Sequence, residues 1–233
     1  MRVLVTRPED DARETAARLE ALGHTAIVAP LIAVHFLSGP ELDLTGVQAF
    51  LSTSSNGVRA LARRSSVRRL PLFAVGRQTA HSARALGFTT VNDADGDVAA
   101  LADHVSARLD PRAGALVHAT AREAPGTLAD ALEARGFRVQ SEFLYETPIV
   151  AELPQVAKDA LRNEVVDTVL LFSARTALAF RQLVERARVE GRCSKLTACC
   201  ISRSCADALF PLAFSALRIA EAPNQDALLA LLG

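Results

Sequence analysis

Small polar residues follow several apolar runs of this sequence, at points where the pattern changes from strand-like to helix-like. The stretches are TSSNGVRAL at 53–61, VGRQTA at 75–80, FSARTALAF at 172–180 and ISRSCA at 201–206. A helix that begins after a strand leaves its first backbone N–H groups unpaired, and these groups attract anions together with the positive end of the helix dipole. The chemistry predicted here is the binding of carboxylates or phosphates by main-chain amides.

The four stretches form two pairs that occur in the same order. Ser54 corresponds to Ser173 in the first pair, and Arg77 corresponds to Arg203 in the second. A further pair accompanies them, because the hexamer LEALGH near the N-terminus is nearly repeated as LEARGF in the middle of the chain. The shared order of these repeats predicts two related halves.

Residues at these junctions, and at the first junction of the chain, are candidates for contact with an anionic substrate. A capping side chain accepts a hydrogen bond from the same amides that an anion would use. Four candidates therefore keep two interpretations, a structural cap and a ligand contact: Ser54, Thr79, Ser173 and Ser204. An arginine directly before a proline can also simply face water, so Arg7 likewise has two interpretations, a solvent-exposed side chain and a ligand contact. The full set is Thr6, Arg7, Ser54, Ser55, Asn56, Gly76, Arg77, Thr79, Ser173, Ala174, Arg175, Ser202 and Ser204.

Short apolar runs alternate with helix-like patterns along the chain. The segment DDARETAARLEAL, for example, places its small and apolar residues on one face, and Gly23 follows it as a C-cap. Strands that alternate with helices predict parallel sheets covered on both faces, so the predicted fold class is α/β. The predicted strands are 2–6, 25–29, 47–53, 72–75, 115–118, 138–144, 168–172, 198–201 and 217–220.

The charge of the chain is balanced, with 26 basic and 26 acidic residues among 233. A balanced charge produces no long-range field that would recruit nucleic acid or an anionic membrane, so we expect neither as a partner. Apolar runs fall short of the roughly 20 residues that span a bilayer. The N-terminus turns acidic too early for a signal peptide. We expect a cytoplasmic protein.

The cysteines and one histidine are further candidates for metal or proton chemistry. Cys193, Cys199, Cys200 and Cys205 lie close together in sequence, but their spacing is unlike that of zinc ligands, so we expect no metal site. His118 ends a predicted strand, and a structural imidazole is the favoured interpretation over a titrating one.

Longer motifs cover nearly the whole chain. They are VLVTRPEDDA, AFLSTSSNGVRAL, LFAVGRQTAHSARALGF, ALEARGFRV followed by Tyr145, VLLFSARTALAF and the terminal APNQDAL. Taken in order, they resemble the uroporphyrinogen-III synthase family, which forms the macrocycle in tetrapyrrole biosynthesis. GRQTA is not a dinucleotide fingerprint, because it lacks the G-x-G-x-x-G spacing.

This resemblance implies an architecture of two similar α/β domains, each a parallel sheet flanked by helices, with a cleft between them. One domain would be discontinuous and consist of residues 1–34 and 149–233, and residues 37–142 would form the other. A linker of two strands, at about 30–36 and 143–150, would join them.

The resemblance also implies a reaction. The substrate would be hydroxymethylbilane, a linear tetrapyrrole with many carboxylates, which the family closes with inversion of ring D and loss of water. The pyrrole nitrogens stabilise the cationic species, so no metal or organic cofactor is expected. A monomer is implied, and hydroxymethylbilane synthase, which makes the substrate, is a candidate partner.

Tyr145 is the single tyrosine of the chain and occupies the position of a tyrosine that faces the cleft in the family. A phenol is protonated at neutral pH and can donate a hydrogen bond to the departing hydroxyl. The alternative is an aromatic side chain that only packs, on Pro148 or Phe143.

Two stretches depart from the family pattern. Residues 201–206 read ISRSCA where the family has I-G-x-x-T-A, and ATAREAPG at 119–126 lacks a glycine that commonly follows the strand. These departures leave open the alternative that this protein is a non-catalytic relative, which binds tetrapyrroles or acts as a regulatory module. A nucleotide-using α/β enzyme is a second alternative, which the missing P-loop disfavours.

Overall fold

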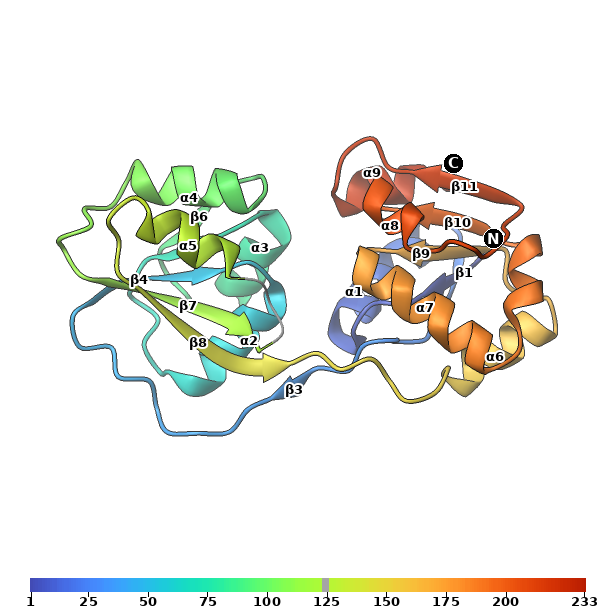
Figure 1. The fold of residues 1–233 in the computed structure, drawn as a ribbon, viewed down its shortest axis with the longest axis horizontal. Coiled ribbons are helices and arrows are strands. Elements are labelled where there is room, and N and C mark those ends of the chain that lie inside the picture. Colours follow the sequence, from blue (N-terminus) through green and yellow to red (C-terminus); the bar gives the residue numbers. More distant parts are fainter. Residues whose placement is uncertain (123–125) are drawn as a thin grey trace. The chain divides into compact units, whose positions relative to one another are not determined.

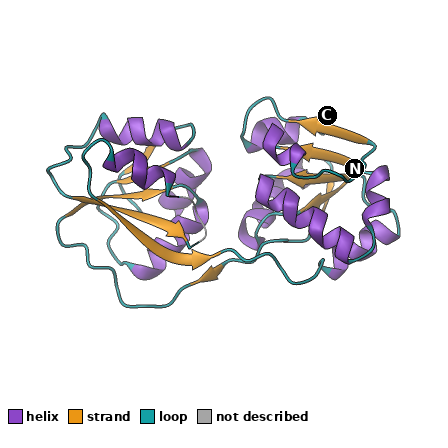
Figure 2. Cartoon of the chain, in the orientation of Figure 1, coloured by secondary structure: helices purple, strands orange, loops and turns teal. Residues whose placement is uncertain are grey.

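The chain divides into two compact units in a computed structural model that describes residues 1–122 and 126–233. The discontinuous unit comprises Met1–Ala33 and Pro148–Gly233, and the inserted unit comprises Val34–Thr147. Figure 2 shows strands at the centre of each unit and helices on the outside. The predicted α/β class is confirmed.

The discontinuous unit is built on a five-stranded sheet in which every neighbouring pair is parallel. The N-terminal strand β1 lies between β2 and β9, so the first residues of the chain pair with a strand from its C-terminal third. Parallel pairing places the carboxyl ends of all five strands at one edge. The order is β11 (Ala216–Ile219), β10 (Thr197–Cys200), β9 (Thr168–Leu171), β1 (Arg2–Val5) and β2 (Thr25–Val28).

Helices cover both faces of this sheet (Figure 1). Along β1, Leu4 contributes to one apolar cluster while Val3 and Val5 contribute to the other, as the alternation of side chains in a strand requires. Helices α6 (Gln155–Arg162), α7 (Ala174–Arg186) and α8 (Arg203–Asp207) pack on the first face with a 3-10 helix (Glu190–Lys195), and α1 (Glu9–Ala21) and α9 (Gln225–Ala230) pack on the second.

The inserted unit contains a six-stranded sheet that is parallel except at one edge, where β3 pairs antiparallel with β8. At that edge His35 lies opposite Glu146 and Phe36 opposite Tyr145. The order is β3 (His35–Phe36), β8 (Val139–Glu146), β7 (Ala115–Ala121), β4 (Val47–Ser52), β5 (Leu72–Ala74) and β6 (Val91–Asp93).

Two helices cover each face of this second sheet. The central strand β4 sends Phe50 into one cluster and Leu51 into the other, and both side chains are fully buried. Helices α2 (Ser55–Arg64) and α3 (Arg77–Ala85) pack on the first face, and α4 (Val98–Ser106) and α5 (Thr127–Glu133) pack on the second.

The chain passes between the two units at two places, and the segments that flank these places pair antiparallel with each other within each unit. In the discontinuous unit, Ile32 bridges to Ile149 and the amide of Ala33 donates to the carbonyl of Pro148 at 3.0 Å. In the inserted unit, the amide of Leu37 donates to a carbonyl of β8 at 2.9 Å, beyond the β3 pairing.

The nine predicted strands correspond to β1, β2, β4, β5, β7, β8, β9, β10 and β11, with ends that differ by a few residues. Strand β6 escaped prediction because it is short and contains a single apolar residue, Val91. Residues 123–125, within the stretch ATAREAPG, lie outside the described residues. No helix of the described ranges is long and apolar enough to cross a membrane.

His118 lies on β7 with only 3% of its surface exposed. Burial disfavours the charged imidazolium and lowers the pKa of His118 from 6.5 to about 4. In the part of the chain that the structure describes, its Nε2 has no hydrogen-bond partner. The favoured interpretation of a structural, uncharged imidazole agrees with this environment.

The buried histidine predicts a pH dependence of stability. In the unfolded chain His118 takes up a proton near its ordinary pKa of 6.5, whereas the folded protein does so only at about 4. The free energy of unfolding should therefore be highest above pH 6.5 and fall by about 3 kcal/mol as the pH drops to 4.

Urea denaturation between pH 7 and 4 should show this slope in the wild type and a much flatter one in His118→Leu. His81→Gln, which changes an exposed histidine, serves as the control and should retain the wild-type slope. Equal slopes in wild type and His118→Leu would contradict the assignment.

Candidate functional site

The start of α2 in the inserted unit is held by a serine cap. The amide of Gly57 donates to Ser54 Oγ at 3.0 Å, and Ser52 Oγ donates to the carbonyl of Ser54 at 2.9 Å. Ser54 adopts extended backbone geometry, as an N-cap requires, and its side chain is partly exposed. The prediction that Ser54 suits a helix cap is confirmed.

Gly57 allows this helix start to pack directly on the sheet. A Cβ at this position would lie 2.4 Å from Ser52 Oγ and 2.6 Å from the carbonyl oxygen of Ala119 in β7. Both contacts are far shorter than a carbon atom tolerates, so a glycine is required here by close approach.

The start of α3 differs because its N-cap residue is a glycine. Gly76 makes no side-chain cap, and a Cβ built on it would meet nothing within 4 Å. The start of α3 therefore has no capping side chain, and a small side chain at position 76 would fit. Thr79, another candidate for a cap or a ligand contact, is buried in the first turn of α3 and is not the cap.

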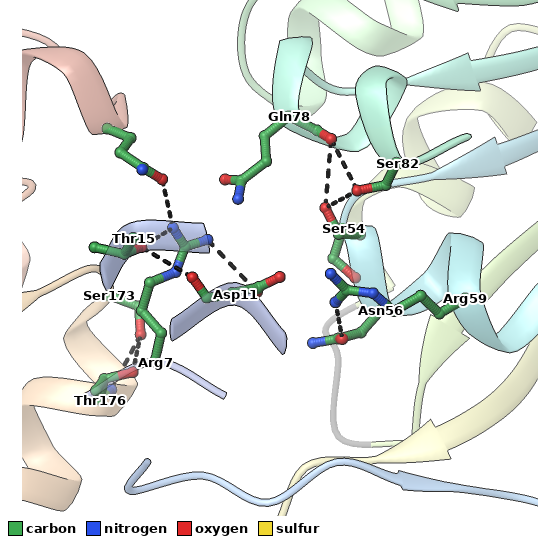
Figure 3. A network of polar contacts seen from close by, with 12 residues as sticks. Arg7, Asp11, Thr15, Ser54, Asn56, Arg59, Gln78, Ser82, Ser173 and Thr176 are labelled. Carbon is green, nitrogen blue, oxygen red and sulfur yellow. Dashed lines mark hydrogen bonds and ion pairs between the residues drawn. The ribbon is translucent and has the colours of Figure 1, made fainter. Parts of the chain in front are cut away.

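Hydrogen bonds join the starts of α2 and α3 to each other (Figure 3). Ser82 Oγ lies 2.9 Å from Ser55 Oγ and 3.1 Å from the carbonyl oxygen of Gln78, and its single proton can be donated to either acceptor. The structure thus brings the predicted residues Ser55, Asn56 and Gly76 to neighbouring strand ends of the inserted unit. Ser82 was not predicted, because its contact depends on how two helices pack.

Two polar candidates of this unit already have protein partners. Asn56 Oδ1 accepts a hydrogen bond from Arg59 Nη1 at 2.7 Å, and Asn56 is only 9% exposed. Arg77 is exposed and pairs with Asp95 at 2.7 Å.

Tyr145 lies near the end of β8 and is only 5% exposed. Its ring belongs to the apolar cluster under α2 and lies 6.4 Å from the ring of Phe36. Its hydroxyl lies 2.8 Å from Ser54 Oγ, so the single tyrosine is coupled to the cap of α2. Phe36 is thus an aromatic neighbour that the sequence did not predict, and Phe143, named with Pro148 as a packing partner, is half exposed.

Two junctions of the discontinuous unit also carry serine caps. Ser173 Oγ accepts from the amide of Thr176 at 3.0 Å, and Ser202 Oγ accepts from the amide of Cys205 at 3.3 Å. Ser204, the remaining candidate for a cap or a ligand contact, is not the cap of α8; its Oγ lies 3.0 Å from Ser202 Oγ. The hydroxyl that replaces the family glycine at position 202 therefore serves the helix itself.

Arg7 is held inside the discontinuous unit by several groups (Figure 3). Its Nη1 donates to Gln225 Oε1 at 2.7 Å and to Thr15 Oγ1 at 3.3 Å, and its Nη2 lies 3.5 Å from Asp11. The guanidinium also lies over the ring of Phe172, 4.3 Å from its centre. Arg7 thereby ties the ends of β1 and β9 to the starts of α1 and α9 and does not face water.

The remaining candidates of this unit are placed differently from one another. Thr6 is fully buried, and its Oγ1 donates to the carbonyl of Leu170 at 2.8 Å. Ala174 is the first residue of α7 and is partly exposed, and Arg175 is exposed. Sequence reasoning missed Gln225 as a partner of Arg7, although the APNQDAL motif contains it.

The described residues hold no group of three or more histidines, cysteines or carboxylates that could bind a metal. The four cysteines are buried and free. Burial raises the pKa of Cys193 to about 12 and that of Cys199 to about 11, so both remain protonated thiols at neutral pH.

Comparison with known proteins decides the family. A family model described as uroporphyrinogen-III synthase HemD matches residues 13–230. The chain belongs to the uroporphyrinogen-III synthase family. Members of this family are cyclising lyases of porphyrin biosynthesis that act on a tetrapyrrole. No curated protein sequence matches the chain.

Solved structures of this family share the fold. Uroporphyrinogen-III synthetase from Helicobacter pylori is 19% identical with a TM-score of 0.68, covering 100% of this chain and 98% of that chain. A mutant uroporphyrinogen III synthase from the extremely thermophilic bacterium Thermus thermophilus is 18% identical with a TM-score of 0.51, covering 100% of this chain and 97% of that chain. At 18% and 19% identity, the similarity to these structures is evidence for a shared fold alone.

The two glycines at the helix starts should respond differently to a methyl group. Gly57→Ala forces a Cβ against Ser52 and the β7 backbone, so it should lower the free energy of unfolding by about 1–3 kcal/mol. Gly76→Ala enters open space and should cost less than about 1 kcal/mol. Thermal or urea unfolding of both variants measures this, and equal losses would contradict the close approach at Gly57.

Proposed function

We propose that this protein closes hydroxymethylbilane to uroporphyrinogen III, with inversion of ring D and loss of water. The observation that carries the proposal is the match of the family model across residues 13–230. The helix start at Gly76, which has no side-chain cap, and the capped helix starts at Ser54 and Ser173 suit a substrate that bears many carboxylates.

The reaction requires that the substrate is held in the right geometry more than it requires a strong acid or base. Loss of the terminal hydroxyl gives an electron-poor azafulvene, attack at the substituted carbon of ring D gives a spiro intermediate, and its rearrangement inverts the ring. The pyrrole nitrogens supply the electrons for these steps, so no cofactor is needed. The protein must hold the two ends of the linear tetrapyrrole in the geometry that leads to inversion.

Main-chain amides are the proposed carboxylate ligands. The protein has no net charge, with 26 basic and 26 acidic residues. Several arginines near the junctions are already engaged within the protein, among them Arg7, Arg59 and Arg77. The partial positive charge at helix starts, above all at the uncapped start of α3, attracts carboxylates without further cationic side chains.

Tyr145 is the proposed assisting residue, because its hydroxyl is coupled to the α2 cap beside the proposed substrate contacts. The proposed substrate-binding residues are Thr6, Arg7, Ser54, Ser55, Asn56, Gly76, Arg77, Thr79, Ser173, Ala174, Arg175, Ser202 and Ser204. Of these, Thr6 and Thr79 are buried as whole residues and Arg7 and Arg77 already have partners within the protein, so in this proposal these four residues position the neighbouring amides.

We also infer two domains of about 1–34 with 149–233 and 37–142, joined by linker strands at about 30–36 and 143–150. A monomer in the cytoplasm is the proposed working form. Hydroxymethylbilane synthase is the proposed partner, because its product is unstable and must reach this enzyme before it closes without inversion.

The product isomer tests the proposed function. Hydroxymethylbilane generated enzymatically is incubated with the purified protein, and isomers I and III are separated by chromatography after oxidation. We expect isomer III to predominate, whereas buffer alone gives isomer I. Isomer I alone, together with tight binding of a tetrapyrrole, would instead identify a non-catalytic binding module.

A charge placed at the start of α3 should weaken substrate binding without unfolding the protein. Gly76→Asp supplies a cap, which stabilises the helix by a few tenths of a kcal/mol, and a negative charge that repels carboxylates. Its KM should be about tenfold above that of Gly76→Asn, equivalent to ~1.4 kcal/mol, because asparagine caps without charge. Equal KM values for the two variants would remove the α3 start from the binding site.

Tyr145→Phe should slow turnover and preserve the fold, since the ring keeps its packing and only the hydroxyl is lost. Steady-state kinetics and a melting curve measure the two properties together. Wild-type kcat in a folded variant would exclude Tyr145 from the mechanism.

A further inference from the structure

We propose that Ser54 is the hydroxyl that contacts the departing oxygen of the substrate, and that Tyr145 is a positioning residue that acts through Ser54. This inference rests on the proposed function and assigns a separate task to each member of the pair. It follows from the hydrogen-bond geometry at Ser54 Oγ and from the unequal exposure of the two side chains.

The hydrogen-bond capacity of Ser54 Oγ allows its proton to point toward a ligand. A serine hydroxyl has two lone pairs and one proton. The Gly57 amide can only donate, and it occupies one lone pair at 3.0 Å. When Tyr145 donates its proton at 2.8 Å, the second lone pair is filled as well. The Ser54 proton then points in the remaining direction and is available to a ligand.

Exposure distinguishes the two hydroxyl-bearing residues. Tyr145 is 5% exposed, its ring packs in the core of the inserted unit, and β8 holds its backbone. Ser54 is partly exposed at the N-terminus of α2. A substrate at this helix start therefore reaches Ser54 Oγ and not the buried phenol.

The proton transfers of the proposed step balance. The bond between the terminal carbon and its hydroxyl oxygen breaks, its electron pair leaves with the oxygen, and the pyrrole nitrogen lone pair forms the new double bond of the azafulvene. Ser54 gives its proton to the departing oxygen, which leaves as water, and Tyr145 gives its proton to Ser54. Ring closure later releases one proton from ring carbon, which returns to the pair.

The corresponding serine of the discontinuous unit lacks this arrangement. Ser173 caps α7 with the same amide geometry, at 3.0 Å, but its Oγ lies 2.9 Å from Thr176 Oγ1, a residue of its own helix. Tyr145 is the single tyrosine of the chain. The two similar junctions have thus diverged, and only the one at Ser54 carries a tyrosine donor behind the serine.

Substitutions at Ser54 separate its contribution to stability as a helix cap from the contribution of its hydroxyl to catalysis. Glycine is nearly as good an N-cap as serine, so Ser54→Gly should fold with a loss of only a few tenths of a kcal/mol. Its kcat should fall by about tenfold to a hundredfold, within or just below the usual range of general-acid catalysis, and KM should change much less. Ser54→Thr restores a hydroxyl at the same position and should recover most of the kcat.

Two comparisons exclude a merely structural effect. Asp97→Gly removes the side-chain cap of α4, in which Asp97 accepts from the Ala100 amide at 2.9 Å, and should leave kcat unchanged. Tyr145→Phe should lower kcat in the wild type but should have no further effect in Ser54→Gly, because Tyr145 acts through the serine.

Tyrosine fluorescence tests the hydrogen bond between Ser54 and Tyr145 independently of catalysis. The chain has one tyrosine and no tryptophan, so the emission reports on Tyr145 alone. Ser54→Gly should change this emission, and Asp97→Gly should not.

The outcomes separate this inference from the proposed function. Isomer III from the wild type with wild-type kcat in Ser54→Gly would overturn the role of Ser54 and leave the function intact. Additive losses from Ser54→Gly and Tyr145→Phe would overturn the coupling. Isomer I alone from the wild type would overturn the function, and with it this inference.

Discussion

The structure depends on one recurring constraint: a helix that begins at the carboxyl end of a parallel strand has backbone N–H groups that the helix cannot satisfy. Each sheet places these helix starts along one edge, because its strands run parallel apart from β3. The protein satisfies some starts with side-chain caps, as at Ser54 and Ser173, and leaves the start at Gly76 without one. The junctions therefore differ in whether a side chain already accepts a hydrogen bond from the first amides of the helix.

The polar side chains around these junctions mainly support the backbone. Arg7 joins two strand ends to two helix starts, and Ser82 joins α2 to α3. Because their hydrogen bonds are made within the protein, these side chains hold the amides in place and are not themselves spare cationic or polar ligands. This arrangement is compatible with the proposal that a chain without net charge binds the carboxylates of a tetrapyrrole through main-chain amides.

The sequence predicted the elements of the fold because apolar runs report burial directly. All nine predicted strands exist, and the repeat of small polar residues after the strands marked helix starts that the structure contains. Strand β6 has too few apolar residues to give that signal. Contacts between elements, such as Arg7 with Gln225 or Tyr145 with Ser54, depend on packing that periodicity does not encode.

The candidate site was predicted at the level of backbone position more than of side-chain orientation. Thr6 and Thr79 were identified from their place after a strand, yet both side chains are buried. Position after a strand therefore predicts a junction but not which of its residues a ligand can reach. The serine at position 202 can replace the glycine of the family pattern and still begin a helix, because its hydroxyl accepts a hydrogen bond from the Cys205 amide.

The central claim is that main-chain amides at helix starts bind the carboxylates of the tetrapyrrole. Backbone and arginine side-chain N–H resonances of the labelled protein, measured by NMR during titration with uroporphyrinogen III without oxygen, test it most directly. We expect the largest shifts at the amides that follow β4, β5 and β9. Shifts confined to arginine side chains, with those amides unmoved, would contradict it.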